Sequence, residues 1–224
     1  MAGARVVAVL TRAPASGGKT RLFTALGREC DPALLTALLL DTLDGLAAPG
    51  VRRVVAVDPA SRCAEVRAIV PDSIGVFGQP AGSLGERMRA IMTQLLEEGA
   101  RSVVLVGSDL READSRVVTE AFRLLDEDPG ALVLGPAADG GYYLIGASRV
   151  PDVFAGISWG TSTVLAETVA AAGRAAIRVC LVEPLGDVDT PADLDRVARS
   201  PTGRHLRTAD WARANSRARK SRAN

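Results

Sequence analysis

Three aspartates at the ends of apolar stretches are the residues in this chain best suited to chemistry. Asp109 follows the apolar run 103–106, and Asp187 and Asp189 follow the run 177–182. Carboxylates at the ends of two strands can meet at one edge of a sheet, where they repel each other unless a cation neutralises them. Mg²⁺ takes oxygen ligands and shares them with substrate phosphates. The sequence therefore predicts that Asp109, Asp187 and Asp189 hold Mg²⁺ or Mn²⁺ at an enzyme site for a nucleotide.

A glycine-rich segment, 11–22, follows the first apolar run of the chain. Glycines expose backbone N–H groups, and neighbouring cations add positive charge, a combination that suits a nucleoside triphosphate or diphosphate. The segment is not a P-loop, because the first glycine of that motif would fall at Ala13. We expect Lys19 and Arg21 to stabilise charge on the phosphates. The residues predicted to bind the nucleotide here are Arg12, Gly17, Gly18 and Lys19.

Two further places are predicted to contact the nucleotide. Ser108 precedes Asp109 at the end of an apolar run. The segment 78–88 begins a helix, where Gln79 is a candidate for reading a nucleobase edge and Arg87 for meeting a phosphate, with Gly85 between them. Acidic Glu86 near this helix start also suits the helix dipole without any function.

The acceptor of the reaction is predicted to bind at two glycine-containing segments. Asp139 precedes a pair of glycines that let the backbone approach a ligand closely. Its predicted roles are binding a hydroxyl, positioning the acceptor or acting as a base, and forming a turn is the alternative. Hydroxyls in 157–165 can cap a helix or offer its N-terminus to an anion. The candidate acceptor residues are Gly140, Gly141, Trp159, Gly160, Thr161 and Ser162.

Apolar runs of strand length alternate with helix-period segments along the chain. The predicted strands are 5–10, 53–57, 74–77, 102–107, 131–134 and 177–182, with 141–146 as an extra strand that can run antiparallel. The predicted helices are 31–47, 62–69, 84–98, 114–126, 162–173 and a last helix through Val197. This alternation predicts an α/β fold with a mostly parallel sheet covered on both faces. We expect one catalytic domain at 1–199.

The charge of the chain is unevenly spread. Its formal net charge is +1, but residues 200–224 hold seven basic side chains against one acidic one, which leaves a charge of −5 on residues 1–199. The domain thus lacks a global basic surface, so nucleic acid is an unlikely partner. The composition of 200–224 favours a basic, flexible tail, with a helix anchored by Trp211 as the alternative.

Cysteine and histidine usage narrows the class of protein. The three cysteines are far apart, with no metal-ligand or disulfide spacing, which favours reduced thiols in a cytoplasmic protein. His205 is the single histidine and lies in the tail, which argues against histidine-based catalysis. The sequence shows neither a signal peptide core nor an apolar run of membrane-spanning length, so no membrane partner is expected.

These segments together resemble the glycosyltransferase-A-like family called radical-SAM/selenodomain-associated transferase 1. The chain is also similar, more distantly, to phospholactate and phosphoenolpyruvate guanylyltransferases. The resemblance spans nearly all of 5–199 and is carried by 19–22, 84–88, 107–109, 135–146, 159–165 and 187–191. It implies a three-layer α/β/α nucleotide-diphospho-sugar transferase fold, magnesium on Asp109 and Asp189, and a phosphorylated acid held near 160–162.

The chain departs from the family pattern at a few positions. The first loop is one residue short before Lys19, Arg12 replaces the common lysine, and Arg111 stands where proline is expected after Asp109-Leu110. Ser83 replaces a usual aspartate. These differences bear on nucleotide choice and acceptor geometry more than on the fold.

Three functions follow from the sequence. The leading one is nucleotidyl transfer from an NTP to a small phosphorylated or similarly acidic acceptor, with release of pyrophosphate. The alternative is glycosyl transfer from a nucleotide sugar, for which Asp139 would activate an acceptor hydroxyl. A non-catalytic nucleotide- or RNA-binding protein is the third. A homodimer is the default expectation for the assembly.

Overall fold

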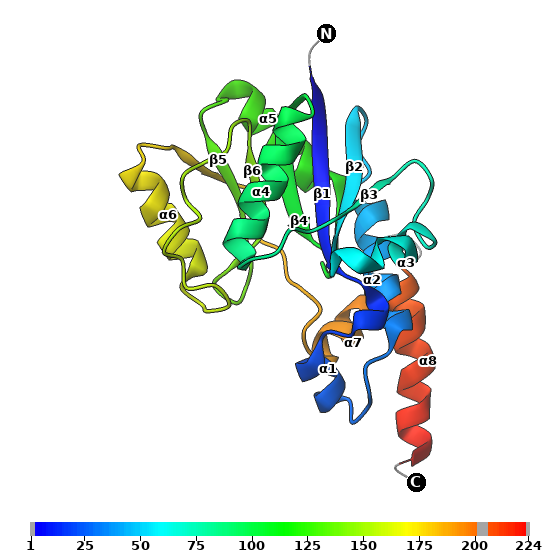
Figure 1. Cartoon of the computed structure of the whole chain (residues 1–224). Coiled ribbons are helices and arrows are strands. Elements are labelled where there is room, and N and C mark those ends of the chain that lie inside the picture. Colours follow the sequence, from blue (N-terminus) through cyan, green and yellow to red (C-terminus); the bar gives the residue numbers. More distant parts are fainter. Residues whose placement is uncertain (1–2, 201–205, 223–224) are drawn as a thin grey trace.

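A seven-stranded sheet forms the centre of the computed structural model, which describes residues 3–200 and 206–222 (Figure 1). The strands lie in the order β3-β2-β1-β4-β6-β5-β7. All neighbours pair in parallel except β6, which runs antiparallel to both β4 and β5, as 141–146 predicted. The strands are β1 (Ala4–Arg12), β2 (Val51–Asp58), β3 (Gly75–Gly78), β4 (Ala100–Gly107), β5 (Leu132–Pro136), β6 (Tyr142–Ala147) and β7 (Val179–Leu181).

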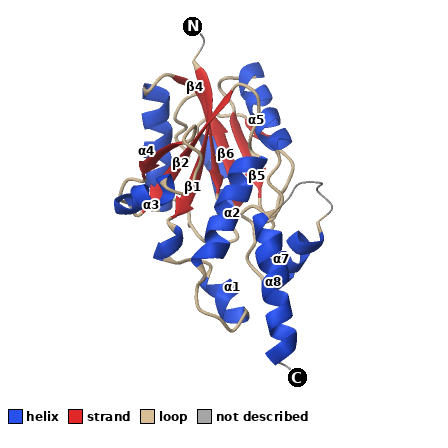
Figure 2. Ribbon diagram, turned by 90° about the vertical axis from the view of Figure 1, so that its right-hand side faces the viewer, coloured by secondary structure: helices blue, strands red, loops and turns tan. Residues whose placement is uncertain are grey.

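Helices cover both faces of this sheet, so the predicted α/β class is confirmed. In Figure 2, α2 and α5 lie on one side of the strands and α4 on the other. Side chains of β1 alternate between the two layers: Val7 and Val9 join one core cluster, and Val6 and Ala8 join the other. The helices are α1 (Thr20–Ala25), α2 (Pro32–Gly45), α3 (Cys63–Arg67), α4 (Leu84–Glu97), α5 (Ser115–Glu127), α6 (Val164–Arg174), α7 (Pro191–Arg199) and α8 (Arg207–Arg222), with short 3-10 turns at Pro14–Ser16 and Ala60–Arg62.

Capping residues fix where the site-forming helices begin. Asp31 caps α2 by accepting a hydrogen bond from the Ala33 amide, with Pro32 in the first turn. Thr190 and Asp193 form a reciprocal capping box at the start of α7. This box fixes the start of α7 directly after the segment that carries Asp187 and Asp189.

The C-terminal segment differs from the predicted flexible tail and matches the alternative, a helix anchored by Trp211. Residues 207–222 form α8, which packs against α2 and α7, and Leu206, Ala209 and Ala212 are buried in a third core cluster. The buried carboxylate of Asp41 accepts hydrogen bonds from the backbone N–H groups of Arg207 and Thr208, at 3.0 and 2.8 Å. Composition could not reveal this cap, because its partner lies 166 residues away.

The sequence analysis did not predict helix α1 and could not be checked at His205. α1 was read as part of the first loop, and its six residues are too few to show a helical period. His205 lies outside the described residues. Within the described part of the chain, no helix combines the length and apolarity required to span a membrane.

Candidate active site

The segments that carry the three aspartates are joined by their backbones. Leu110 and Asp187 form an antiparallel bridge, the Arg111 amide donates to the Gly186 carbonyl at 2.9 Å, and the Val188 amide donates to the Asp109 carbonyl at 2.9 Å. Val188 is fully buried between two more exposed aspartates. Alternation along an extended segment therefore places Asp187 and Asp189 on one side, opposite Val188.

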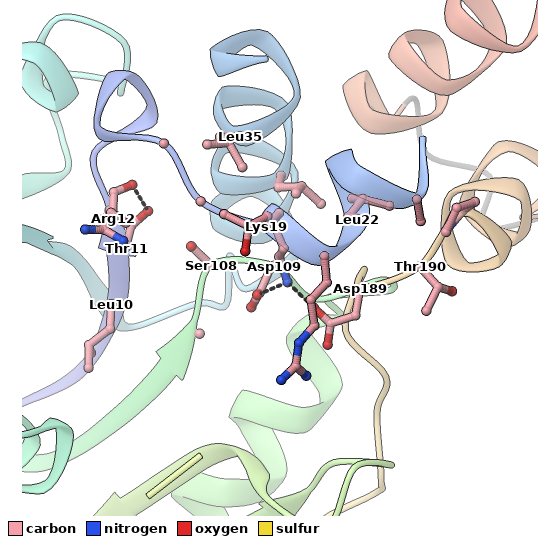
Figure 3. Close-up of a pocket in the computed structure, with 18 residues that line it drawn as sticks. Leu10, Thr11, Arg12, Lys19, Leu22, Leu35, Ser108, Asp109, Asp189 and Thr190 are labelled. Carbon is pink, nitrogen blue, oxygen red and sulfur yellow. Dashed lines mark hydrogen bonds and ion pairs between the residues drawn. The ribbon is translucent and has the colours of Figure 1, made fainter. Parts of the chain in front are cut away.

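The glycine-rich loop turns Lys19 toward these carboxylates. Gly17 and Gly18 have φ angles of 74° and 157°, and Lys19 itself is left-handed, with a φ of 50°. Glycine adopts such angles without strain, whereas lysine does so at a cost of about 1–3 kcal/mol. Lys19 Nζ contacts Asp109 Oδ2 and lies 2.7 Å from Asp189 Oδ1, as the dashed lines in Figure 3 show. The lysine therefore joins two acids that are 80 positions apart in the sequence.

Electrostatics in this cluster are strongly coupled. Burial alone would lower the pKa of Lys19, but Asp109 and Asp189 outweigh it, and the net pKa lies above its ordinary value. Burial and the negative charge of Asp109 raise the pKa of Asp187 to about 7. Asp187 Oδ1 is buried and has no hydrogen-bond partner in the described structure. Two carboxylates thus pair with one ammonium group, and the Asp187 carboxyl beside them is buried with one oxygen unpartnered.

A cavity of about 670 Å³ opens beside this cluster (Figure 3). It lies where β1 and β4 end, since Leu10 pairs with Gly107 in the sheet. The carboxyl edge of parallel strands is the usual ligand position in such sheets. All of the nucleotide-binding residues predicted in the first loop and beside Asp109 line it: Arg12, Gly17, Gly18, Lys19, Arg21 and Ser108.

The predicted metal-binding aspartates do not form a ready-made ligand cage. Among the described side chains, no group of three or more His, Cys, Asp or Glu residues is arranged to hold a metal ion. The ammonium of Lys19 lies between Asp109 and Asp189 instead. The donor chemistry nevertheless fits Mg²⁺, because the buried Asp187 oxygen lacks a partner and Mg²⁺ needs only one or two carboxylates when phosphates supply further oxygens.

A second cavity, of about 340 Å³, adjoins the first and shares Leu10 and Gly107 with it. The negative charge of Asp139, which lines this cavity, is also one cause of the raised pKa of Asp187. Most of the predicted acceptor residues line this second cavity: Asp139, Gly141, Trp159, Gly160 and Thr161.

Gly140 and Ser162 lie in the walls behind this cavity and do not line it. A Cβ atom on Gly140, whose φ is 88°, would lie 2.1 Å from the Ser162 carbonyl oxygen. The Gly140 carbonyl accepts a hydrogen bond from the Leu165 amide at 3.0 Å. These two residues therefore hold the acceptor segments together through their backbones.

Three residues predicted to bind nucleotide line neither cavity. Gln79 is buried, and its amide nitrogen donates to the backbone carbonyls of Thr11 and Ala56 at 3.2 and 2.9 Å. With those protons engaged, Gln79 ties β1 to β2 and does not face a base. Arg87 pairs with Asp58 at 3.3 Å and donates to Gln79. Gly85 is needed for close packing, since a Cβ atom there would lie 2.7 Å from the Trp159 ring.

Other lining residues escaped the sequence prediction. Tyr142 lines the second cavity and packs edge-on against Trp159, with ring centroids 6.3 Å apart. Its position directly after the Asp139 glycine pair was the available signal. Leu84 and Met88 of α4 also line this cavity, and Thr190 lines the first. Their apolar or capping character gave no sign of a site.

Fold and site together define a nucleotide-diphospho-sugar-transferase-like α/β protein. The profile of the family described as "Uncharacterized protein conserved in bacteria (DUF2064)" matches residues 42–161, and the chain belongs to this family. A 3-phospho-D-glycerate guanylyltransferase from Phenylobacterium zucineum (strain HLK1) is 33% identical over 205 residues, which cover 87% of this chain and 89% of that protein.

Solved structures agree on the fold. A protein from Desulfovibrio desulfuricans G20, provisionally assigned as a nucleotide-diphospho-sugar transferase, superposes with a TM-score of 0.84 at 32% identity, covering 95% of each chain. A CMP:2-keto-3-deoxy-manno-octonic acid synthetase complexed with CTP gives a TM-score of 0.54 at 19% identity, covering 87% of this chain and 96% of the other. At that identity, the second likeness concerns the fold alone.

Proposed function

We propose that this protein is a magnesium-dependent nucleotidyltransferase that joins an NMP moiety from an NTP to a small phosphorylated acid. The observation that carries the proposal is the meeting of Lys19 with Asp109 and Asp189 at the floor of the larger cavity. The 33% identical guanylyltransferase supports the same reaction class and suggests GTP and 3-phospho-D-glycerate as first substrates to test.

The larger cavity is the proposed nucleotide site. Its backbone amides at Gly17 and Gly18 and the side chains of Arg12, Lys19 and Arg21 supply the positive groups that a triphosphate needs. Asp109, Asp187 and Asp189 would hold the metal ion. A bound Mg²⁺ there would neutralise charge on the triphosphate as pyrophosphate departs.

The smaller cavity is the proposed acceptor site. An ionised phosphate oxygen of the acceptor would attack the α-phosphorus, forming one P–O bond while the bond to the pyrophosphate oxygen breaks. An ionised nucleophile needs no general base, which agrees with a site built without histidine in its described lining. The chain would contribute orientation and charge neutralisation.

Glycosyl transfer is the second candidate. It is favoured by the 32% identical structure with a provisional sugar-transferase assignment and by the exposed Asp139 carboxylate in the smaller cavity. A hydroxyl acceptor requires a base, and Asp139 would serve as one. We also propose that the chain is a selenodomain-associated transferase. A cytoplasmic location and a homodimeric assembly are proposed as well.

The deciding experiment offers the protein Mg²⁺ with each NTP in turn and 3-phospho-D-glycerate, and measures pyrophosphate release and the mass of the product. We expect pyrophosphate and an NMP conjugate with one preferred NTP. Parallel reactions with common nucleotide sugars and the same acceptor test the alternative. Turnover of a nucleotide sugar, with no pyrophosphate from any NTP, would replace the leading proposal with glycosyl transfer.

A further inference from the structure

Lys19 lies in an unusual place for a residue expected to bind phosphate. Its side chain is only 13% exposed, and its ammonium group is paired with the carboxylates of Asp109 and Asp189. The loop keeps it there despite the left-handed backbone at Lys19, a conformation that L-residues with side chains rarely adopt. The surrounding structure must therefore favour the contact with the two acids.

The charge balance explains why Lys19 contacts the two acids. Without a cation, Asp109, Asp187 and Asp189 would lie close together with nothing to offset their repulsion. Lys19 offsets part of it but leaves one Asp187 oxygen buried without a partner. The ammonium group therefore neutralises part of the negative charge that a divalent ion would neutralise on the same carboxylates.

We propose that Lys19 is an internal placeholder for the metal: it holds the aspartate cluster together in the free protein and exchanges the carboxylates for triphosphate oxygens when metal and nucleotide enter together. The inference rests on the proposed function, since it takes the larger cavity as the site of a metal-bound nucleotide. A lysine stem has enough rotatable bonds to move its ammonium while its backbone stays fixed.

The exchange makes metal binding depend on whether a triphosphate enters with the metal. Metal alone must compete with an ammonium group that is already paired to two of its ligands, so it binds weakly. Metal that arrives with a triphosphate brings new partners for Lys19, so the ammonium loses little when it leaves the acids. The cluster thereby favours the metal–nucleotide complex over the free ion.

The test measures Mn²⁺ binding to the nucleotide-free protein by electron paramagnetic resonance, together with thermal unfolding with and without Mn²⁺. Lys19→Met removes the competing charge and keeps a stem of similar length. We expect this variant to bind Mn²⁺ at least about tenfold more tightly than the unchanged protein. Its midpoint should fall in EDTA and recover with Mn²⁺. Lys19→Gln serves the same purpose if the methionine variant does not fold.

Two further variants make the result specific. Arg21→Met removes one positive charge from the same cavity but from a residue that makes no ion pair with the aspartates in the described structure, so it should change Mn²⁺ affinity far less. Adding Asp187→Asn to Lys19→Met should remove most of the gain, because it removes a carboxylate from the cluster.

Equal Mn²⁺ affinity in Lys19→Met and in the unchanged protein would overturn the placeholder role, as would an equal gain in Arg21→Met. Neither measurement contains a nucleotide. Tighter Mn²⁺ binding in a protein that releases no pyrophosphate would thus support the placeholder and reject the proposed reaction. Pyrophosphate release without the affinity gain would do the reverse.

Discussion

The guanidinium of Arg111 lies 3.4 Å from the carboxylate of Asp193 and so joins the two segments that carry the site aspartates. Arg111 follows β4, and Asp193 lies in the first turn of α7, directly after Asp187 and Asp189. Both side chains are largely shielded, at 26% and 11% exposure. The side chain thus adds to the backbone bridge between Leu110 and Asp187.

Arg111→Met should loosen this connection. We expect a loss of about 1 kcal/mol in the free energy of unfolding, because a partly shielded charged hydrogen bond is removed while Asp193 keeps its capping role. Binding of Mg²⁺ with the preferred NTP should weaken severalfold. Urea unfolding and calorimetry measure the two effects. Arg196→Met is the matched control, because Arg196 pairs with the same oxygen from within α7 and should leave nucleotide affinity unchanged. Equal effects in both variants would contradict a bridging role for Arg111.

Asp187→Asn should separate stability from metal binding. Asparagine relieves repulsion with Asp109 and removes a buried carboxylate whose Oδ1 lacks a partner. In EDTA we expect an unchanged or higher midpoint of thermal unfolding, with a rise of about 2–4 °C for each 1 kcal/mol gained. The stabilisation by Mg²⁺ with the preferred NTP should be lost. Asp189→Asn should instead lower the midpoint, because Lys19 loses a partner. A midpoint in EDTA that falls strongly in Asp187→Asn would show that Asp187 stabilises the folded protein and would contradict this prediction.

The sequence predicted much of this arrangement, and its failures have physical causes. Alternating apolar runs placed Asp109 near the end of β4, whereas Asp189 lies well beyond the end of β7 and is brought to the site by the bridge between Leu110 and Asp187. The inward turn of Lys19 depends on backbone angles at Gly17 and Gly18 that composition does not encode. Gln79 looked available for a base, yet its protons bond to carbonyls of two other strands. Those contacts exist only after the sheet forms.

Glu167→Gln should alter acceptor binding without touching the nucleotide site. Glu167 accepts hydrogen bonds from the Ser158 amide at 2.7 Å and the Thr163 hydroxyl at 2.6 Å, and so braces the loop that presents Trp159 to the smaller cavity. We expect the acceptor KM to rise about threefold to tenfold with little change in the NTP KM. Glu120→Gln on α5 is the control, because it also loses a paired carboxylate but lies on a helix that lines neither cavity. A change in the NTP KM alone would contradict the assignment.

Acid should remove the stabilising effect of Glu167. The Ser158 amide and then the Thr163 hydroxyl hold the pKa of Glu167 below its ordinary 4.5. A carboxyl with a lowered folded-state pKa stabilises the fold above its unfolded pKa, and this contribution is lost as the pH falls through the folded value. The unchanged protein and Glu167→Gln should therefore differ in urea unfolding at pH 7 and converge once the pH falls below the lowered pKa of Glu167. A difference that persists in acid would assign the effect to packing.

Trp211→Ala should show that α8 supports the nucleotide loop. The Trp211 ring packs edge-on against Phe23 of α1, with centroids 6.4 Å apart, and its Nε1 donates to Asp31 at 2.8 Å. Loss of these contacts should cost about 2–3 kcal/mol of unfolding free energy, less than for a fully buried tryptophan. Because α1 begins directly after Lys19, Mg²⁺ with the preferred NTP should also bind more weakly. Ala214→Gln, on the exposed side of α8, should change neither quantity. An unchanged free energy of unfolding in Trp211→Ala would show that the contacts of Trp211 do not stabilise the fold.

Asp139→Asn distinguishes the two transferase mechanisms. One Asp139 oxygen accepts a hydrogen bond from the Gly141 amide at 3.0 Å, and an asparagine carbonyl can keep that bond, so the turn should survive. A hydroxyl acceptor needs a base in its transition state, and loss of such a base costs about 10²–10⁴ in rate. An ionised phosphate needs none. We therefore expect pyrophosphate release from the NTP to persist within about tenfold in Asp139→Asn. A collapse of kcat with unchanged substrate KM values would instead make Asp139 a base and favour an acceptor that attacks through a hydroxyl group.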